Sequence, residues 1–270
     1  MIRAIFFDLD DTLIDSAPAW RAGLDAAFAG LLKHRPELSR EAIQAAWQGA
    51  SRALGARLDA GELRVAQVRE RRWHEALTAL SIIDDLLAAE LEATLAETFI
   101  GGLRLFDDAL EALDRLRGRA FAERPYGQAT TERPYGQATS GGPVHLGIVT
   151  NGAADEALDS QYTKALRTGL LDRVDSFLAS DAAGYRKPDP RIFALALARA
   201  GVAPLEAIYV GDSISNDVVG ANRAGMLSVL LWRACEPQPT LEGEQRPARV
   251  IGSLAEVPAL LAASPQRNGL

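Results

Sequence analysis

The chain has 270 residues, of which 48% are hydrophobic and 24% charged, a composition typical of a soluble globular protein with one large or two modest domains. Its formal net charge of −7 argues against a nucleic-acid surface, because phosphate backbones are bound by concentrated Lys and Arg. The single cysteine, Cys235, excludes an internal disulfide, and no apolar run approaches the ~20 residues that span a bilayer, so we expect a cytoplasmic protein without a membrane partner.

Short apolar runs predict the strands of a sheet. They lie at residues 2–8, 144–150, 174–179, 207–211 and 227–232, and helical patterns at 153–168, 189–200 and 214–224 fall between the later ones. Strands that alternate with helices favour right-handed crossovers and a parallel sheet covered on both faces. We therefore predict an α/β fold with a doubly wound parallel sheet. The polar stretch at 236–249 is predicted to be a loop.

Residues 17–100 contain no strand-like run. Apolar residues recur there at helical spacing, for example Trp20, Leu24, Phe28 and Leu31. This pattern predicts an all-helical domain at 17–100, inserted into a sheet domain at 1–16 and 101–270. Within the sheet domain, "AERPYGQAT" at 122–130 is followed at once by "TERPYGQAT" at 131–139. Two copies rich in turn residues favour a duplicated flexible loop at 122–142 over a binding motif.

Polar side chains follow the predicted strands at the edge of the sheet where ligands of doubly wound folds bind. Asp8, Asp10 and Thr12 follow the first strand, and Thr150, Asn151 and Gly152 follow the second; Lys187 lies in the loop after the third, and Asp212, Ser213, Asn216 and Asp217 follow the fourth. Each group alone is common in turns and helix caps. Together, and in this order, they predict a site that combines carboxylates, one lysine, and hydroxyl and amide donors.

The segments "FFDLDDTL", "IVTNG", "RKPDP" and "VGDSISND" resemble the four motifs of the haloacid dehalogenase superfamily. The resemblance covers nearly the whole sheet domain. It implies a Rossmann-like core, and the helical block at 17–100 lies where this family carries a helical cap. Most members of the family are magnesium-dependent phosphatases, so the resemblance implies a hydrolase that acts on phosphoric monoesters of small metabolites.

The resemblance also implies roles for individual residues. Asp8 matches the nucleophile that forms an aspartyl-phosphate, and Asp10 matches the general acid and base. The Mg²⁺ ligands would be Asp8, the carbonyl of Asp10 and Asp212, with Asp217 binding directly or through water. Thr150 and the N–H of Asn151 would hold phosphoryl oxygens, and Lys187 would offset their charge. Asp11 and Asp15 are expected to be solvated or turn residues.

Several alternatives stay open. A haloacid dehalogenase needs no metal but lacks an acid at the position of Asp10, and a phosphomutase keeps both acids. A phospho-accepting signalling module is the non-enzyme alternative, although the helical insertion is foreign to so compact a domain. The substrate is open among nucleotides, sugar phosphates and phosphoglycolate-like compounds, and the oligomeric state between monomer and homodimer. In the helical block, Arg69 and Arg72 are expected on a solvated basic face, with Trp73 in the core.

Overall fold

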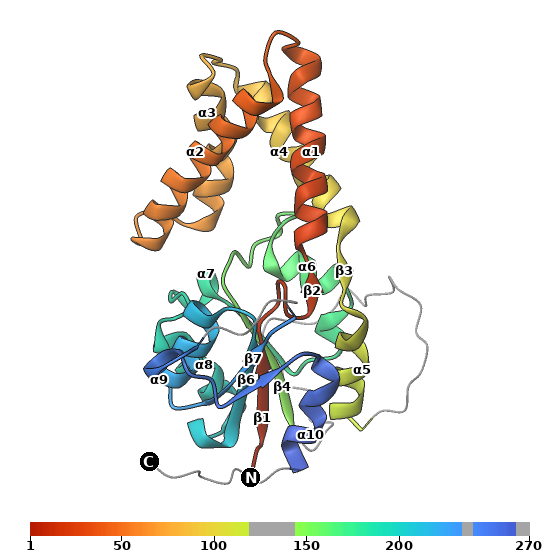
Figure 1. Cartoon of the computed structure of the whole chain (residues 1–270), viewed down its shortest axis with the longest axis vertical. Helices are drawn as coiled ribbons and strands as arrows, with labels where there is room; N and C mark the ends of the chain where they lie inside the picture. The colour runs from red at the N-terminus through yellow and green to blue at the C-terminus, as the bar shows by residue number, and fades with distance from the viewer. Residues whose placement is uncertain (119–143, 234–239, 263–270) are drawn as a thin grey trace. The chain divides into compact units, whose positions relative to one another are not determined.

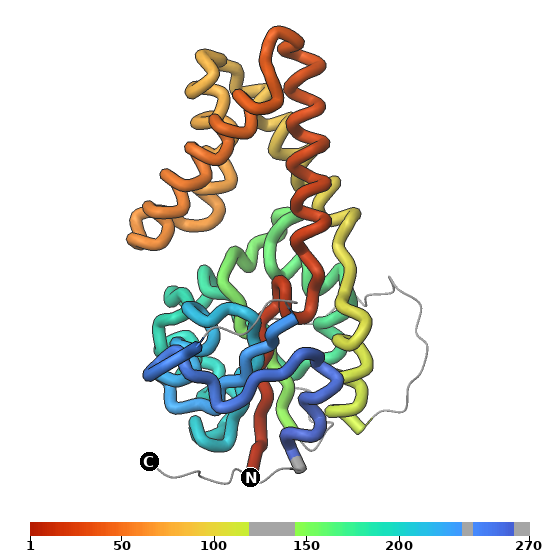
Figure 2. Tube along the Cα trace, in the orientation of Figure 1, coloured from red at the N-terminus to blue at the C-terminus, as the bar shows by residue number. Residues whose placement is uncertain are grey.

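The chain divides into two compact units in the computed structural model, which describes residues 1–118, 144–233 and 240–262. Unit 1 comprises Met1–Asp15, Arg104–Ala154 and Gln161–Leu270, and unit 2 comprises Ser16–Leu103 and Asp155–Ser160. Figures 1 and 2 show the sheet and its helices in unit 1 and the long helices of unit 2. The assignment of these units as catalytic core and cap stays a prediction. The duplicated loop at 122–142 and Cys235 lie outside the described residues.

Unit 1 is built on a six-stranded sheet in the order β5-β4-β1-β6-β7-β8. The strands are β1 (Ala4–Phe7), β4 (His145–Thr150), β5 (Ser176–Ala179), β6 (Ala207–Gly211), β7 (Leu227–Leu231) and β8 (Arg249–Ile251). All neighbours in this sheet pair in parallel. Numbered along the chain, the order is 3-2-1-4-5-6, in which the winding reverses at β1. The predicted doubly wound parallel sheet is therefore confirmed.

The centre of the sheet is buried on both faces, which explains its continuous apolar strands. Every residue of β1 is buried, and Phe7 lies between Ile148 of β4 and Val210 of β6 in the register. Phe193 of α8 packs against the sheet, with its ring 4.9 Å from that of Tyr209. The helices of unit 1 are α5 (Asp107–Leu116), α6 (Gln161–Arg167), α7 (Ser180–Ala183), α8 (Pro190–Ala200), α9 (Val219–Arg223) and α10 (Val257–Ala262).

The structure corrects two sequence-based boundaries and adds one element. The helix predicted at 153–168 begins only at Gln161, because Asp155 forms a local turn in which its Oδ1 accepts the N–H of Ala157 at 3.2 Å. The loop predicted at 236–249 ends in β8, an edge strand too short for its pattern to be recognised. A two-stranded antiparallel ribbon of β2 (Ile14–Asp15) and β3 (Arg104–Leu105) is also new.

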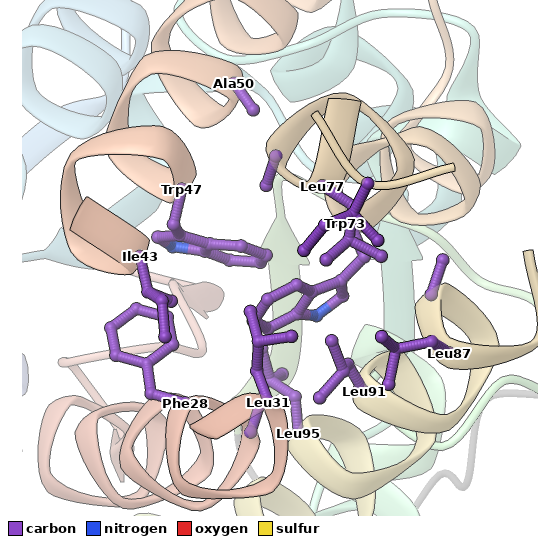
Figure 3. Packing of buried hydrophobic residues seen from close by; sticks show 14 residues of the cluster. Phe28, Leu31, Ile43, Trp47, Ala50, Trp73, Leu77, Leu87, Leu91 and Leu95 are labelled. Atoms are coloured by element: carbon purple, nitrogen blue, oxygen red, sulfur yellow. The ribbon is translucent and has the colours of Figure 1, made fainter. Parts of the chain in front are cut away.

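Unit 2 contains the predicted helical insertion, folded as four helices around an aromatic core (Figure 3). The helices are α1 (Ala17–His34), α2 (Arg40–Asp59), α3 (Val65–Ala79) and α4 (Asp85–Gly102). Trp73 is 1% exposed, its ring lies 4.6 Å from that of Trp47, and Phe28 meets it edge-on. Trp73 is thus a core residue, as predicted. Among the described helices, none combines the length and the apolarity that crossing a bilayer requires.

The basic residues beside Trp73 do not form the expected solvated face. Arg72 is buried and donates through Nε to Glu92 at 2.7 Å, and its guanidinium lies over the ring of Trp20. Arg69 Nε lies 2.6 Å from Asp159 Oδ1, and Arg72 also pairs with Asp159. The acidic partners neutralise both arginines, which allows the burial of Arg72 next to the aromatic core. The expectation of a solvated basic face is therefore wrong.

Candidate active site

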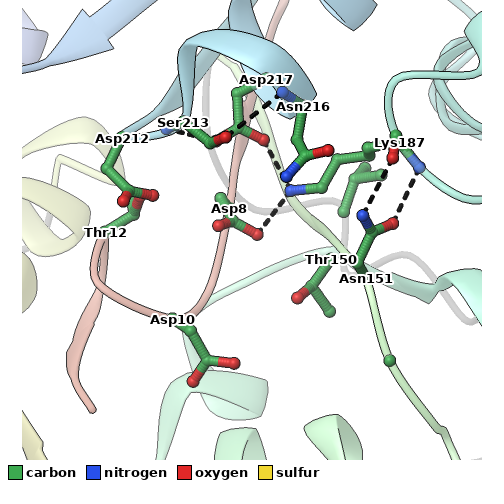
Figure 4. Close-up of polar contacts among 12 residues, drawn as sticks. Asp8, Asp10, Thr12, Thr150, Asn151, Lys187, Asp212, Ser213, Asn216 and Asp217 are labelled. Carbon is green, nitrogen blue, oxygen red and sulfur yellow. Dashed lines mark hydrogen bonds and ion pairs between the residues drawn. The ribbon is translucent and has the colours of Figure 1, made fainter. Parts of the chain in front are cut away.

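The predicted site residues of unit 1 lie at the carboxyl ends of neighbouring parallel strands. Asp8 directly follows β1, Asp212 directly follows β6, and Thr150 ends β4. Since β1 pairs with both β4 and β6, the fold brings these three residues to the point where the winding of the sheet reverses. Figure 4 shows Asp8, Asp217 and Lys187 gathered there.

Lys187 is the centre of the buried polar cluster. Its Nζ donates to Asp8 Oδ1 at 2.6 Å, to Asp217 Oδ1 at 2.7 Å and to the hydroxyl of Tyr209 at 2.9 Å, and only 4% of the residue is exposed. Burial opposes its charge, but Asp217 and Asp8 together raise the pKa of Lys187 above its ordinary value. The two carboxylates therefore stabilise the ammonium form of Lys187 beside the predicted nucleophile.

Asn151 holds the backbone of Lys187 in place. Its side-chain Oδ1 accepts the N–H of Lys187 at 2.8 Å, and its Nδ2 donates to the carbonyl of Lys187 at 3.0 Å. The following helix α8 starts as predicted at Pro190, where Asp189 accepts the N–H of Arg191 at 2.9 Å. The Asn151 side chain thus holds the backbone of Lys187, while the contact with a phosphoryl group is predicted for the backbone N–H of Asn151.

Asp8, Asp212 and Asp217 form a group that could hold a metal ion, with one oxygen of each within 4.8 Å of the others. Together with Lys187 these acids make a group of three carboxylates and one ammonium. When all three acids are ionised, two negative charges are therefore uncompensated. Hard carboxylate oxygens and a charge deficit of this size are what Mg²⁺ requires. The residues therefore fit a divalent cation. The carboxylate of Asp10 is not a member of the group, so the predicted contribution of Asp10 is limited to its carbonyl.

The glycine and aspartates of "VGDSISND" are explained by close packing. A Cβ on Gly211 would lie 2.3 Å from Asp217 Oδ2, so only glycine lets this carboxylate approach the end of β6. Asp217 Oδ2 accepts the N–H of Ser213 at 3.0 Å, which fixes its position over the strand end. Thr12 donates through Oγ1 to Asp212 Oδ1 at 3.3 Å and orients the other acid.

Burial raises the pKa values of two of these acids. For Asp8, burial outweighs the opposing effect of Lys187 and, with the nearby charge of Asp217, raises the pKa to about 7. Burial and Asp217 likewise raise the pKa of Asp212 to about 6. Without a cation, both acids hold protons more strongly than an ordinary carboxyl group does, and a bound cation would compete with those protons.

The affinity for Mg²⁺ is therefore expected to increase with pH. Because each ligand must lose its proton, binding releases protons below the pKa values of Asp8, about 7, and Asp212, about 6. The apparent affinity should rise about tenfold between pH 6 and 7, more steeply below pH 6, and level off above about pH 8. Isothermal titration calorimetry in two buffers of different ionisation enthalpy measures both the affinity and the released protons. An affinity that stays constant across this range, without proton release, would contradict the prediction.

Two residues that the sequence analysis missed contact Asp10. Lys164 donates through Nζ to both oxygens of Asp10, at 3.0 and 2.8 Å, and Gln161 donates through Nε2 to Oδ2 at 2.9 Å. Gln161 Nε2 also lies 3.2 Å from the hydroxyl oxygen of Thr150. The only signal in the sequence is a pair of polar residues three positions apart in the helix after the second strand, a spacing common on solvated helices.

Comparisons with known proteins agree with the four motifs. A family model for haloacid dehalogenase-like hydrolases matches residues 2–225. The phosphoserine phosphatase of Thermus thermophilus is 31% identical over 95% of this chain and 98% of its own, and a glyceraldehyde 3-phosphate phosphatase of Methanopyrus kandleri is 28% identical over 86% of this chain and 85% of its own. The structure of a 2-haloacid dehalogenase from Pseudomonas syringae pv. Tomato DC3000 aligns with a TM-score of 0.67 and 28% identity, over 97% of this chain and 99% of that one. The resemblance inferred from the motifs is therefore confirmed.

Proposed function

Since the chain belongs to the haloacid dehalogenase-like hydrolases, we propose that it is a magnesium-dependent phosphatase that acts on a small phosphomonoester through an aspartyl-phosphate on Asp8. The observation that carries this proposal is the 2.6 Å pairing of Asp8 with Lys187, inside a group of three acids that fits a divalent cation. The relatives named as phosphatases support the same class of reaction. Release of inorganic phosphate from para-nitrophenyl phosphate tests the proposal, and its absence under all metal conditions would contradict it.

In the first half of the reaction, an oxygen of Asp8 attacks phosphorus and the bond from phosphorus to the leaving oxygen breaks. Asp10 gives its proton to that leaving oxygen, so the product departs as an alcohol. Lys187 stabilises the negative charge on the phosphoryl oxygens as a point charge, and the Thr150 hydroxyl donates a hydrogen bond to them. The neighbour of Thr150 Oγ1 at 3.2 Å is the NH₂ group of Gln161, which cannot accept a hydrogen bond, so the hydroxyl hydrogen of Thr150 is left to be donated.

In the second half, water attacks the aspartyl-phosphate. Asp10, now ionised, takes a proton from the water while the bond from Asp8 oxygen to phosphorus breaks, which regenerates the carboxylate of Asp8 and releases inorganic phosphate. The same residue thus gives a proton and takes one back. The 27% exposure of the Asp10 side chain supports this role, because a group that meets both substrate and water needs access to both.

The residues that would hold Mg²⁺ are Asp8, Asp212 and the carbonyl of Asp10, with Asp217 as support. When bound, the ion supplies positive charge against the phosphoryl oxygens. Asp217 is proposed in a supporting place because both its oxygens already accept hydrogen bonds, Oδ1 from Lys187 and Oδ2 from the N–H of Ser213.

Removal of the metal should abolish activity. In EDTA, phosphate release is expected to fall to background and to return when excess Mg²⁺ is added, because two buried negative charges are otherwise uncompensated. Ca²⁺ should not restore it, since its larger and looser ligand shell misplaces the nucleophile. Phosphate release assayed after exhaustive chelation checks this prediction. Full activity in that assay would rule out the metal-dependent mechanism.

The dehalogenase alternative can be tested directly, and a 2-haloacid dehalogenase does have a similar fold. The acid at Asp10 argues against a dehalogenase. When a dehalogenase forms its ester intermediate, the halide leaves as an ion and needs no proton from a general acid. Assays of chloride release from 2-chloropropionate and of phosphate release, on the same preparation, separate the two reactions. A phosphomutase would instead convert one sugar phosphate isomer to another without net phosphate release. A non-catalytic signalling module is disfavoured by the hydrolase family match.

The substrate class is proposed from the substrates that the names of two relatives give. Phosphoserine and glyceraldehyde 3-phosphate, named for two relatives, are both small anionic phosphomonoesters. We propose the same general class for this chain, with nucleotides, other sugar phosphates and phosphoglycolate-like compounds as further candidates. A panel of phosphorylated metabolites, compared by kcat/KM, identifies the preferred leaving group.

A further inference from the structure

The carboxylate of Asp10 is fixed by two buried donors from α6. Lys164 reaches both of its oxygens, and Gln161 reaches Oδ2. The two residues are three positions apart, so they project from one face of the helix. They are only 7% and 6% exposed, whereas the side chain of Asp10 is 27% exposed. In Figure 4 the carboxylate of Asp10 points away from that of Asp8.

Gln161 connects Asp10 to the end of β4. Its Nε2 lies 2.7 Å from the carbonyl oxygen of Asn151 and 3.2 Å from the hydroxyl of Thr150, besides its contact with Asp10. Two of these neighbours, the carboxylate of Asp10 and the carbonyl of Asn151, can only accept hydrogen bonds, so they determine the orientation of the amide: its oxygen would be repelled there. That oxygen, Oε1, is buried and has no hydrogen-bond partner among the described residues. The position of the amide thus satisfies its N–H groups and leaves its oxygen without a hydrogen bond from the described part of the chain.

The backbone leaves room for this arrangement at Gly152. Its φ of +147° is a conformation that residues with side chains rarely adopt. A Cβ on Gly152 would also lie 2.6 Å from Cγ of Gln161. Both constraints require glycine at position 152. The turn "TNG" therefore has the backbone shape that leaves space for the side chain of Gln161.

We propose that Lys164 and Gln161 are positioning residues that hold Asp10 where it exchanges protons with the leaving group and with water. This inference rests on the proposed function. Proton transfer requires the carboxylate oxygen within hydrogen-bond distance of the reacting oxygen. An aspartate side chain rotates about two bonds, and donors on both of its oxygens restrict both rotations. An error of about 1 Å in such a group costs on the order of 100-fold in rate.

A purely structural role or a substrate-binding role for Lys164 would give different kinetics. If the contact only neutralises a buried lysine, its loss lowers stability and leaves the catalytic steps unchanged in the folded protein. If Lys164 binds the substrate directly, its loss raises KM. A positioning role instead slows the hydrolysis of the phosphoenzyme, which lowers kcat and KM together for a good leaving group and leaves kcat/KM nearly unchanged. It also acts only when Asp10 is present.

The test compares Lys164→Met with Lys33→Met, the same substitution at an exposed lysine in the last turn of α1. With para-nitrophenyl phosphate and Mg²⁺, Lys164→Met should lower kcat on the order of 10- to 100-fold and lower KM along with it, so that kcat/KM stays within about threefold of the wild type, whereas Lys33→Met should match the wild type in both constants. Since this leaving group hardly needs a proton, hydrolysis of the phosphoenzyme should slow most, giving a burst of para-nitrophenol that approaches one equivalent per enzyme. Gln161→Met should act in the same direction more weakly, and it replaces Lys164→Met if that variant does not fold.

A double-mutant cycle completes the test. In the Asp10→Asn background, Lys164→Met should leave the rate of phosphoenzyme hydrolysis unchanged, because it acts through Asp10. An equal loss in both backgrounds, a raised KM at unchanged kcat, or wild-type kinetics in folded Lys164→Met would each overturn the inference. Failure of the proposed function itself would be distinct, because the wild type would then release no phosphate.

Discussion

Asp8→Asn is expected to reduce phosphatase turnover to background, a loss on the order of 10⁴-fold or more. An amide of the same shape cannot attack phosphorus, so no covalent intermediate forms. Steady-state release of para-nitrophenol with saturating Mg²⁺ measures the loss. Asp11→Asn is the matched control, since Asp11 lies three residues away with a φ of 58°, a conformation that asparagine tolerates well, and it should keep its activity. Comparable losses in both variants would contradict the assignment of Asp8.

The stability of the metal-free protein shows whether Asp8→Asn is still folded. Burial raises the pKa of Asp8 to about 7, above its ordinary value of 3.8, so the folded state binds a proton more strongly than the unfolded state. Asp8 therefore lowers stability progressively as the pH rises from about 4 to about 7, and asparagine removes this effect. In EDTA at about pH 8, Asp8→Asn should melt no lower than the wild type. A much lower melting temperature would mean that the loss of activity reflects unfolding.

Asp10→Asn is expected to divide substrates by their leaving groups. Asparagine cannot donate the proton that an alkoxide leaving group needs, so turnover of alkyl phosphates should fall by about 10²- to 10⁴-fold at the first step. Para-nitrophenolate leaves without a proton, so its first release should persist while hydrolysis of the phosphoenzyme slows. Rapid-quench kinetics with both kinds of substrate measure the two steps separately. Equal losses in the first step for both kinds of substrate would contradict the role of Asp10.

The sheet and its polar edge are predictable from the sequence for physical reasons. A parallel strand buried on both faces must be a continuous apolar run, and "AIFF" of β1 is buried at every position. The chain order of the strands then brings Asp8, Asp212 and Lys187 to one edge without any knowledge of side-chain geometry. The edge strand β8 is not predictable in this way, because its three residues are too few to form a recognisable apolar run.

The contacts around Asp10 are not predictable in the same way. Lys164 and Gln161 lie on a short helix whose start the hydrophobic pattern places eight residues too early, because Asp155 and Asp159 direct the preceding segment into local turns and ion pairs. A buried lysine is rare, so the pattern favours a solvated residue unless the partner is known. That partner, Asp10, is 154 residues away in the chain. Long-range pairing of this kind requires the structure.

The proposed mechanism depends on Asp8 carrying the phosphoryl group during turnover, and intact-protein mass spectrometry detects that group. Two proteins are compared: the single variant Asp10→Asn, and the double variant that carries both Asp8→Asn and Asp10→Asn. Each is incubated briefly with para-nitrophenyl phosphate and Mg²⁺ and quenched in acid. We expect the added mass of one phosphoryl group on Asp10→Asn and none on the double variant. A phosphorylated double variant would place the nucleophile elsewhere, and the absence of a phosphorylated form from Asp10→Asn, despite release of para-nitrophenol, would contradict the covalent mechanism.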